Sequence, residues 1–103
     1  MVESQFASHL ASSHHVALEA RIVRDRHLGD AVVFTLARSG GELLRAHLAW
    51  CAAEAGAFQI DSCSVGTRVD AAAVRSVCSG LRGGGYLVRT SPDLAELLGE
   101  VSE

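Results

Sequence analysis

Residues 58–78 read FQIDSCSVGTRVDAAAVRSVC, and this stretch changes from one type of structure to another. The segment 58–61, FQID, is predicted to be a short strand. The polar segment 62–69 is predicted to be a loop. From Asp70 onward, apolar residues recur at the spacing of one helix face. They are Val74, Val77, Cys78 and Leu81. A strand that leads through a loop into a helix is the repeating unit of an alternating α/β fold.

The segments before this stretch predict a hairpin. In residues 16–23, apolar side chains alternate with others at a period of two, which favours a half-buried strand. Residues 31–38 are apolar on both faces, which is typical of a strand in the middle of a sheet. Gly29 and Asp30 between them are turn formers, so the two strands are predicted to be antiparallel.

Three helices are expected, each with its own end signals. The first covers 41–56, where Ser39 and Glu42 have capping-box spacing and Gly56 is the stop. The second begins at Asp70 and ends at the glycines 83–85. The third follows a strand at 86–90 and begins with Ser91 as N-cap and Pro92 as its first residue. Its apolar positions repeat the spacing of the second helix. They are Leu94, Leu97, Leu98 and Val101.

The predicted fold class is therefore α/β, with the order β-β-α-β-α-β-α and a mixed four-stranded sheet covered by helices. The alternation predicts that strands 31–38, 58–61 and 86–90 are parallel neighbours joined by right-handed crossovers. Ligand and partner sites gather beyond the carboxyl ends of such strands, which points to the loop 61–70. Residues 1–14 are predicted to be an N-terminal extension, either a short helix or disordered, and 15–103 a single domain.

Composition excludes several functions. The chain has 103 residues, twelve Asp and Glu, and nine positive residues that are all arginine and all dispersed. The absence of a basic run argues against nucleic-acid binding. No apolar run reaches the length of a membrane span, and the first ten residues lack the pattern of a signal peptide, so we expect a cytoplasmic protein.

Chemically reactive residues do not form a recognisable motif. Cys51, Cys63 and Cys78 are odd in number and widely spaced, so we expect free thiols packed as small hydrophobic side chains. The five histidines lack metal-ligand spacing, and no metal or cofactor is predicted. No nucleophile with a base and no paired carboxylates are apparent, so the chain is predicted not to be an enzyme. Trp50 lies on the flank of the first helix, as an exposed partner anchor or at the margin of the core.

The element order and three segments resemble the STAS domain, the fold of anti-sigma factor antagonists. The segment FQIDSCSVGTRVDAAAVRSV resembles that family's strand, loop, aspartate and helix start. The segments 31–57 and 83–101 are similar to its second strand with first helix and to its closing strand with helix. The resemblance implies that Asp70 matches the aspartate before the serine or threonine that a kinase phosphorylates. Ala71 and Ala72 occupy the hydroxyl positions, so phosphorylation at the usual site is not expected.

The resemblance implies a non-catalytic protein-interaction module that regulates a partner through residues 61–75. The residues expected to bind this partner share the start and one face of the second helix. They are Asp70, Ala71, Ala72, Ala73, Arg75 and Ser79. The hydroxyls of the preceding loop are predicted first as turn formers and second as alternative phosphate acceptors. They are Ser62, Ser64 and Thr67.

Several partners fit this hypothesis. They are an anti-sigma factor or GHKL-type kinase, a transporter subunit, and a second copy of the chain. Two alternative functions remain open at the level of sequence. In the first, the chain is an accessory subunit of a membrane lipid transporter. In the second, it is a small-ligand sensor that binds a nucleotide or a lipid at the same edge.

Overall fold

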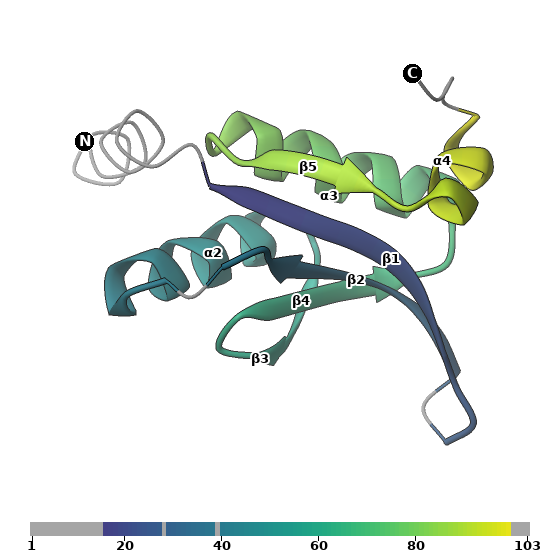
Figure 1. The fold of residues 1–103 in the computed structure, drawn as a ribbon, viewed down its shortest axis with the longest axis horizontal. Helices are drawn as coiled ribbons and strands as arrows, with labels where there is room; N and C mark the ends of the chain where they lie inside the picture. The colour runs from purple at the N-terminus through teal and green to yellow at the C-terminus, as the bar shows by residue number, and fades with distance from the viewer. Residues whose placement is uncertain (1–15, 28, 39, 100–103) are drawn as a thin grey trace.

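A computed structural model describes residues 16–27, 29–38 and 40–99 of the chain. These residues form one mixed sheet with helices packed on one of its faces (Figure 1). The strands are β1 (Ala17–Asp25), β2 (Gly29–Leu36), β3 (Phe58–Asp61), β4 (Ser64–Arg68) and β5 (Leu87–Thr90). The helices are α2 (Glu42–Glu54), α3 (Ala71–Gly83) and α4 (Pro92–Leu98). The predicted α/β class is confirmed. The predictions for residues 1–14, Ser39 and Val101 concern positions outside the described residues.

The predicted hairpin is present as β1 and β2. The two strands are antiparallel, with Leu18 opposite Leu36 and Ala20 opposite Phe34. Gly29 has a φ of 83°, a left-handed conformation that glycine adopts without steric cost, and it begins β2 at the turn. The sheet order is β3-β4-β2-β1-β5, so β2 is the central strand, as predicted from its apolar sequence.

The prediction of a loop at 62–69 is wrong for Ser64–Arg68, which form β4, and it holds for the turn at 62–63. This strand pairs with β2 on one side and β3 on the other, both antiparallel. The hydroxyl of Ser64 finds a partner within the sheet, because it lies 3.1 Å from the hydroxyl of Thr35. Val65 adds an apolar side chain to the core. Hydrogen bonds to neighbouring strands therefore outweigh the turn-like composition of this segment.

The extra strand also corrects the predicted topology. The order is β-β-α-β-β-α-β-α with five strands, rather than β-β-α-β-α-β-α with four. The strands expected to be parallel neighbours are not adjacent, and the parallel pair is β1 with β5. The physical reason is the short turn after Asp61, because a connection of two residues can only return the chain antiparallel.

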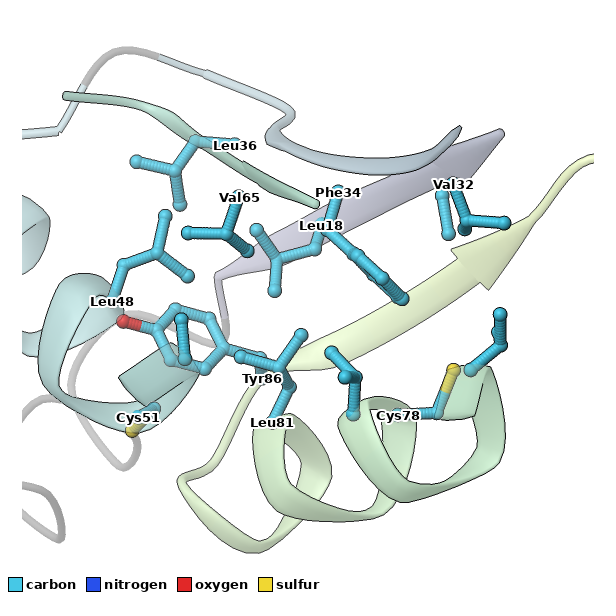
Figure 2. Close-up of a cluster of buried hydrophobic side chains, with 14 of the residues drawn as sticks. Leu18, Val32, Phe34, Leu36, Leu48, Cys51, Val65, Cys78, Leu81 and Tyr86 are labelled. Carbon is cyan, nitrogen blue, oxygen red and sulfur yellow. The ribbon is translucent and has the colours of Figure 1, made fainter. Parts of the chain in front are cut away.

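The core lies between the sheet and the helices α2 and α3. Phe34 at the centre of β2 is fully buried, and Leu18 of β1 and Val65 of β4 lie beside it (Figure 2). Leu48 of α2 and Leu81 of α3 approach this layer from the helix side. The four apolar residues that predicted α3 are all buried, so that helix spacing is confirmed.

The helix ends follow the predicted capping chemistry in part. Asp70 caps α3 and Ser91 caps α4, each accepting a hydrogen bond from a backbone N–H of the first turn. Pro92 is the first residue of α4, as expected. The start of α2 differs, because its N-cap is Gly41, which offers no side-chain hydrogen bond.

Close contact between α2 and α3 depends on a glycine. A Cβ atom placed on Gly80 would lie 2.7 Å from the Cβ of Ala55, just beyond the end of α2. That separation is shorter than any ordinary carbon contact, so any side chain at position 80 would force the helices apart. The glycine thus permits the approach of the two helices that cover the core.

We predict that Gly80→Ala lowers the free energy of unfolding by about 1–3 kcal/mol, because overpacking outweighs the gain in helix propensity. The matched control is Gly83→Ala in the same helix, where a Cβ atom would meet nothing within 4 Å. That variant is expected to be neutral or slightly more stable. Urea denaturation of both variants measures the difference, and equal stabilities would contradict the close packing at Gly80.

Candidate interaction surfaces and a buried polar cluster

The first turn of α3 presents small side chains at the end of β4. The carboxylate of Asp70 accepts from the backbone N–H of Ala73 at 3.2 Å, which confirms its predicted role as a cap. Arg68 lies 3.6 Å from the same carboxylate, but both side chains are well exposed, so this ion pair contributes little to stability. Ala72 is exposed, while Ala71 and Ala73 are half-buried. The surface at the helix start is therefore small and flat.

A shallow groove of about 330 Å³ continues this surface between α3 and α4. The guanidinium of Arg75 donates to the carbonyl of Leu98 at 2.7 Å, which fixes the arginine across the end of α4. Ser79 and Arg82 follow along the same side of α3 and also line the groove. Of the predicted site residues, Arg75 and Ser79 thus share one groove. Helix spacing predicts that Arg82 lies on the same side of α3 as Arg75. Nothing in the sequence indicated the contact of Arg75 with the carbonyl of Leu98.

The three candidate phosphate acceptors differ in accessibility. Ser62 lies exposed in the turn between β3 and β4. Ser64 and Thr67 are 7% and 5% exposed, so the prediction that they belong to an exposed loop is wrong. Both are held within β4, and a kinase would have to open the sheet to reach them. Ser62 is the one of the three that is accessible in the folded chain.

A buried polar cluster, which the sequence did not reveal, joins α2 to the start of β5. Nδ1 of His47 lies 2.8 Å from the hydroxyl of Tyr86, and Nε2 of the same ring lies 3.5 Å from the sulfur of Cys51. The rings of His47 and Tyr86 are stacked, with their centroids 5.4 Å apart. All three side chains are at least 96% buried. Figure 2 shows the Tyr86 hydroxyl directed toward α2. The spacing of His47 and Cys51, four residues apart on α2, was the available sequence signal.

Burial keeps the groups of this cluster neutral. It lowers the pKa of His47 and raises the pKa of Cys51 to about 11, an effect to which the nearby carboxylate of Glu54 adds. Burial, together with Cys51, also raises the pKa of Tyr86. A thiol with such a pKa is not a nucleophile at neutral pH, because the thiolate is the reactive form. The cluster therefore stabilises the contact of α2 with Tyr86.

We predict that the His47–Tyr86 pair is energetically coupled. Tyr86→Phe and His47→Leu should each lower the free energy of unfolding by about 1–3 kcal/mol, because each leaves a buried polar group without this partner. The double variant should lose less than the sum of the two single variants, by about 1 kcal/mol. A double-mutant cycle in urea measures this coupling, and strictly additive losses would contradict it.

The pair also predicts a pH dependence. The pKa of His47 is lowered in the folded chain, so the unfolded chain binds more protons below its ordinary pKa of about 6.5. The contribution of His47 to the free energy of unfolding should therefore be fully present above this pH. On acidification below it, this contribution should fall by up to about 1.4 kcal/mol per pH unit. The decrease should be smaller in His47→Gln, with His27→Gln in the exposed β1–β2 turn as the control.

The three cysteines should react in a fixed order. Cys51 and Cys78 are buried, as predicted, and Cys63 is partly exposed in the β3–β4 turn. We predict that iodoacetamide labels Cys63 in the native chain, and the other two only after unfolding. Mass spectrometry of pulse-labelled protein identifies the sites, and Cys63→Ser should abolish native labelling. Native labelling of Cys51 would show that the polar cluster is open to solvent.

Apolar side chains are also exposed on the outer side of α2 and on the uncovered face of the sheet. Trp50 is 45% exposed, with its ring stacked on that of His47, so it combines both predicted positions, surface and core margin. Leu43, about two helical turns earlier on α2, is also exposed. On the sheet, Phe58 and Ile60 of β3 lie over Gly66, where a Cβ atom would meet their side chains at about 3 Å.

No group of three or more His, Cys, Asp or Glu is arranged to hold a metal ion in the part of the chain that the structure describes. None of the helices described is long and apolar enough to cross a membrane. No protein-family model, curated protein or solved structure matches this chain.

Proposed function

We propose that the chain is a protein-interaction module of the STAS type, which regulates a partner protein through the exposed side of α3 and without phosphorylation at the usual position. The observation that carries this proposal is the groove between α3 and α4, where the carbonyl of Leu98 holds Arg75, and Arg82 makes only a long contact to the carbonyl of Val88. A guanidinium group held by a carbonyl keeps further N–H donors directed to solvent. The surface therefore suits an acidic partner.

The helix start supports the same proposal. Ala72 is exposed at the second position of α3, two residues after Asp70, where a side chain with a hydroxyl would be accessible to a kinase. An alanine cannot be phosphorylated, so binding at this surface is constitutive. Anti-sigma factors and GHKL-type kinases remain the proposed partners on the basis of the family resemblance. The groove is shallow and open, which favours a protein surface over a small ligand enclosed in a pocket.

We predict that Ala72→Glu weakens partner binding at least about tenfold, because it places a negative charge against an acidic partner. The fold should persist, since a glutamate in the first turn of a helix is favourable. Wild-type and variant chains, expressed in the native host, are compared by cross-linking and quantitative mass spectrometry. Thermal unfolding checks that both are folded.

The matched control is Ala46→Glu, the same change at an exposed alanine of α2. A protein that cross-links to the wild type and to the control, but not to Ala72→Glu, supports the proposal. A partner that is retained by Ala72→Glu would place the interface elsewhere on the molecule.

A further inference from the structure

The strand β5 forms one edge of the sheet, with β1 as its neighbour. On the β1 side, the backbone N–H of Leu87 donates to the carbonyl of Val16 at 3.0 Å, and that of Ser91 donates to Ala20 at 2.9 Å. Residues 87 and 91 therefore direct their main-chain groups toward β1. The residues between them determine which main-chain groups β5 exposes on its outer side, away from β1.

Main-chain groups of successive residues in a strand point to opposite sides. Since Leu87 faces β1, Arg89 does so too, whereas Val88 and Thr90 direct their N–H and C=O groups outward. These outward groups are the hydrogen-bonding positions of an unpaired sheet edge. Among the described residues, one side chain contacts these outward groups. The guanidinium of Arg82 lies 3.5 Å from the carbonyl oxygen of Val88. That distance is long for a hydrogen bond, so a better donor could replace it.

A groove of about 560 Å³ runs along this edge. Its lining combines Arg82 at the end of α3 with residues 85–89. Leu87 is 52% exposed beside it and offers an apolar contact. The groove thus places exposed main chain, an apolar side chain and positive charge within one elongated surface.

Within the described residues, the arginines along this groove make no ion pair with a carboxylate. In the described part of the chain, the ion pairs are Arg24 with Asp30 and Arg68 with Asp70, so neither Arg82 nor Arg89 takes part in one. Glu19 lies opposite Arg89 in the β1–β5 register, but the two are not within 4.0 Å of each other. Arg82 and Arg89 therefore give the lining of this groove two positive charges, with Glu19 as a nearby negative one.

We propose that the edge of β5 binds an extended acidic segment of a partner protein, which adds to the sheet as a further strand. Main-chain hydrogen bonds form with Val88 and Thr90, and carboxylates of the segment contact Arg82 and Arg89. This mode of recognition derives affinity from the main chain and specificity from alternate side chains. The site is separate from the start of α3, so it goes beyond the function proposed above.

The opposite edge of the sheet does not share these properties. The strand β3 also exposes apolar side chains, but its charged residue is Asp61, and its sequence FQID contains no arginine. The amide of Gln59 donates to the carbonyl of Asp61 at 3.2 Å, which covers part of that edge. An acidic segment should therefore select β5 over β3.

The experiment titrates the full-length, ¹⁵N-labelled chain with the capped peptide Glu-Val-Glu-Glu-Val-Glu, which places glutamates on both faces of an extended strand. Backbone resonances of Val88 and Thr90 should shift, and hydrogen exchange at these amides should slow at least about tenfold at saturation. The peptide Lys-Val-Lys-Lys-Val-Lys is the charge-reversed control and should not bind. Binding of both peptides, or of neither at about 1 mM, would overturn the proposal, because a charge-selective strand addition requires a difference.

Variants separate the two kinds of contact. Val88→Pro removes an outward N–H at an edge position that tolerates proline, and it should weaken peptide binding about tenfold relative to Val88→Ala. Arg82→Gln and Arg89→Gln should each weaken binding several-fold, with Arg26→Gln in the distant β1–β2 turn as the control. Glu19→Gln should strengthen binding, because it removes the competing carboxylate.

The pattern of losses decides the outcome. If Val88→Pro binds like Val88→Ala while the arginine variants lose affinity, the peptide is held by charge alone and strand addition is wrong. If resonances of β3 shift instead of those of β5, the proposed edge is wrong. Because Ala72 lies outside this groove, Ala72→Glu should bind the peptide as the wild type does, whatever that variant does to the partner at α3.

Discussion

Burial of a single face of the sheet is the constraint on which this structure depends. The helices α2 and α3 cover the face that carries Phe34, Leu18 and Val65, and the hydrophobic effect of this layer stabilises the fold. Both helices must fit over a narrow sheet, which requires the close approach at Gly80. The polar cluster of His47 and Tyr86 then ties α2 to the chain before β5, within the same layer.

One-sided burial leaves the rest of the sheet in contact with solvent. Its uncovered face presents Phe58 and Ile60, and its two edges present main-chain groups. Natural sheets protect their edges with charged side chains or covering segments. Arg82 serves this purpose at β5 only weakly, with a long contact to one carbonyl. The Val88 carbonyl can exchange its weak contact with Arg82 for a stronger hydrogen bond, which makes the edge of β5 suited to binding an extended segment.

The two proposed surfaces meet at Arg82. This residue lines both the groove between α3 and α4 and the groove along β5. A partner that contacts the start of α3 could therefore extend an acidic segment past Arg82 to the sheet edge. Such an arrangement would combine a small, flat contact with an extended one, and the arginines would guide the approach of a negatively charged protein.

Local sequence patterns determined much of this fold. The alternation in β1, the apolar sequence of β2 and the helix spacing of α3 each reflect a burial pattern that a short segment contains by itself. The caps at Asp70 and Ser91 were also predictable, since a cap acts within one helical turn. For the candidate site, the sequence placed Arg75 and Ser79 on one side of α3.

Only the tertiary structure decided how these elements combine. The strand β4 could not be recognised from its letters, because Ser64, Gly66 and Thr67 gain their stability from β2 and β3 on either side. The resulting hairpin changed the strand order and buried two hydroxyls that were expected on the surface. The pairing of His47 with Tyr86, 39 residues apart, and the position of β5 at the edge of the described sheet likewise depend on how the elements assemble. Interactions between distant segments are decided by packing, whereas those within a turn or a strand can be predicted from the sequence.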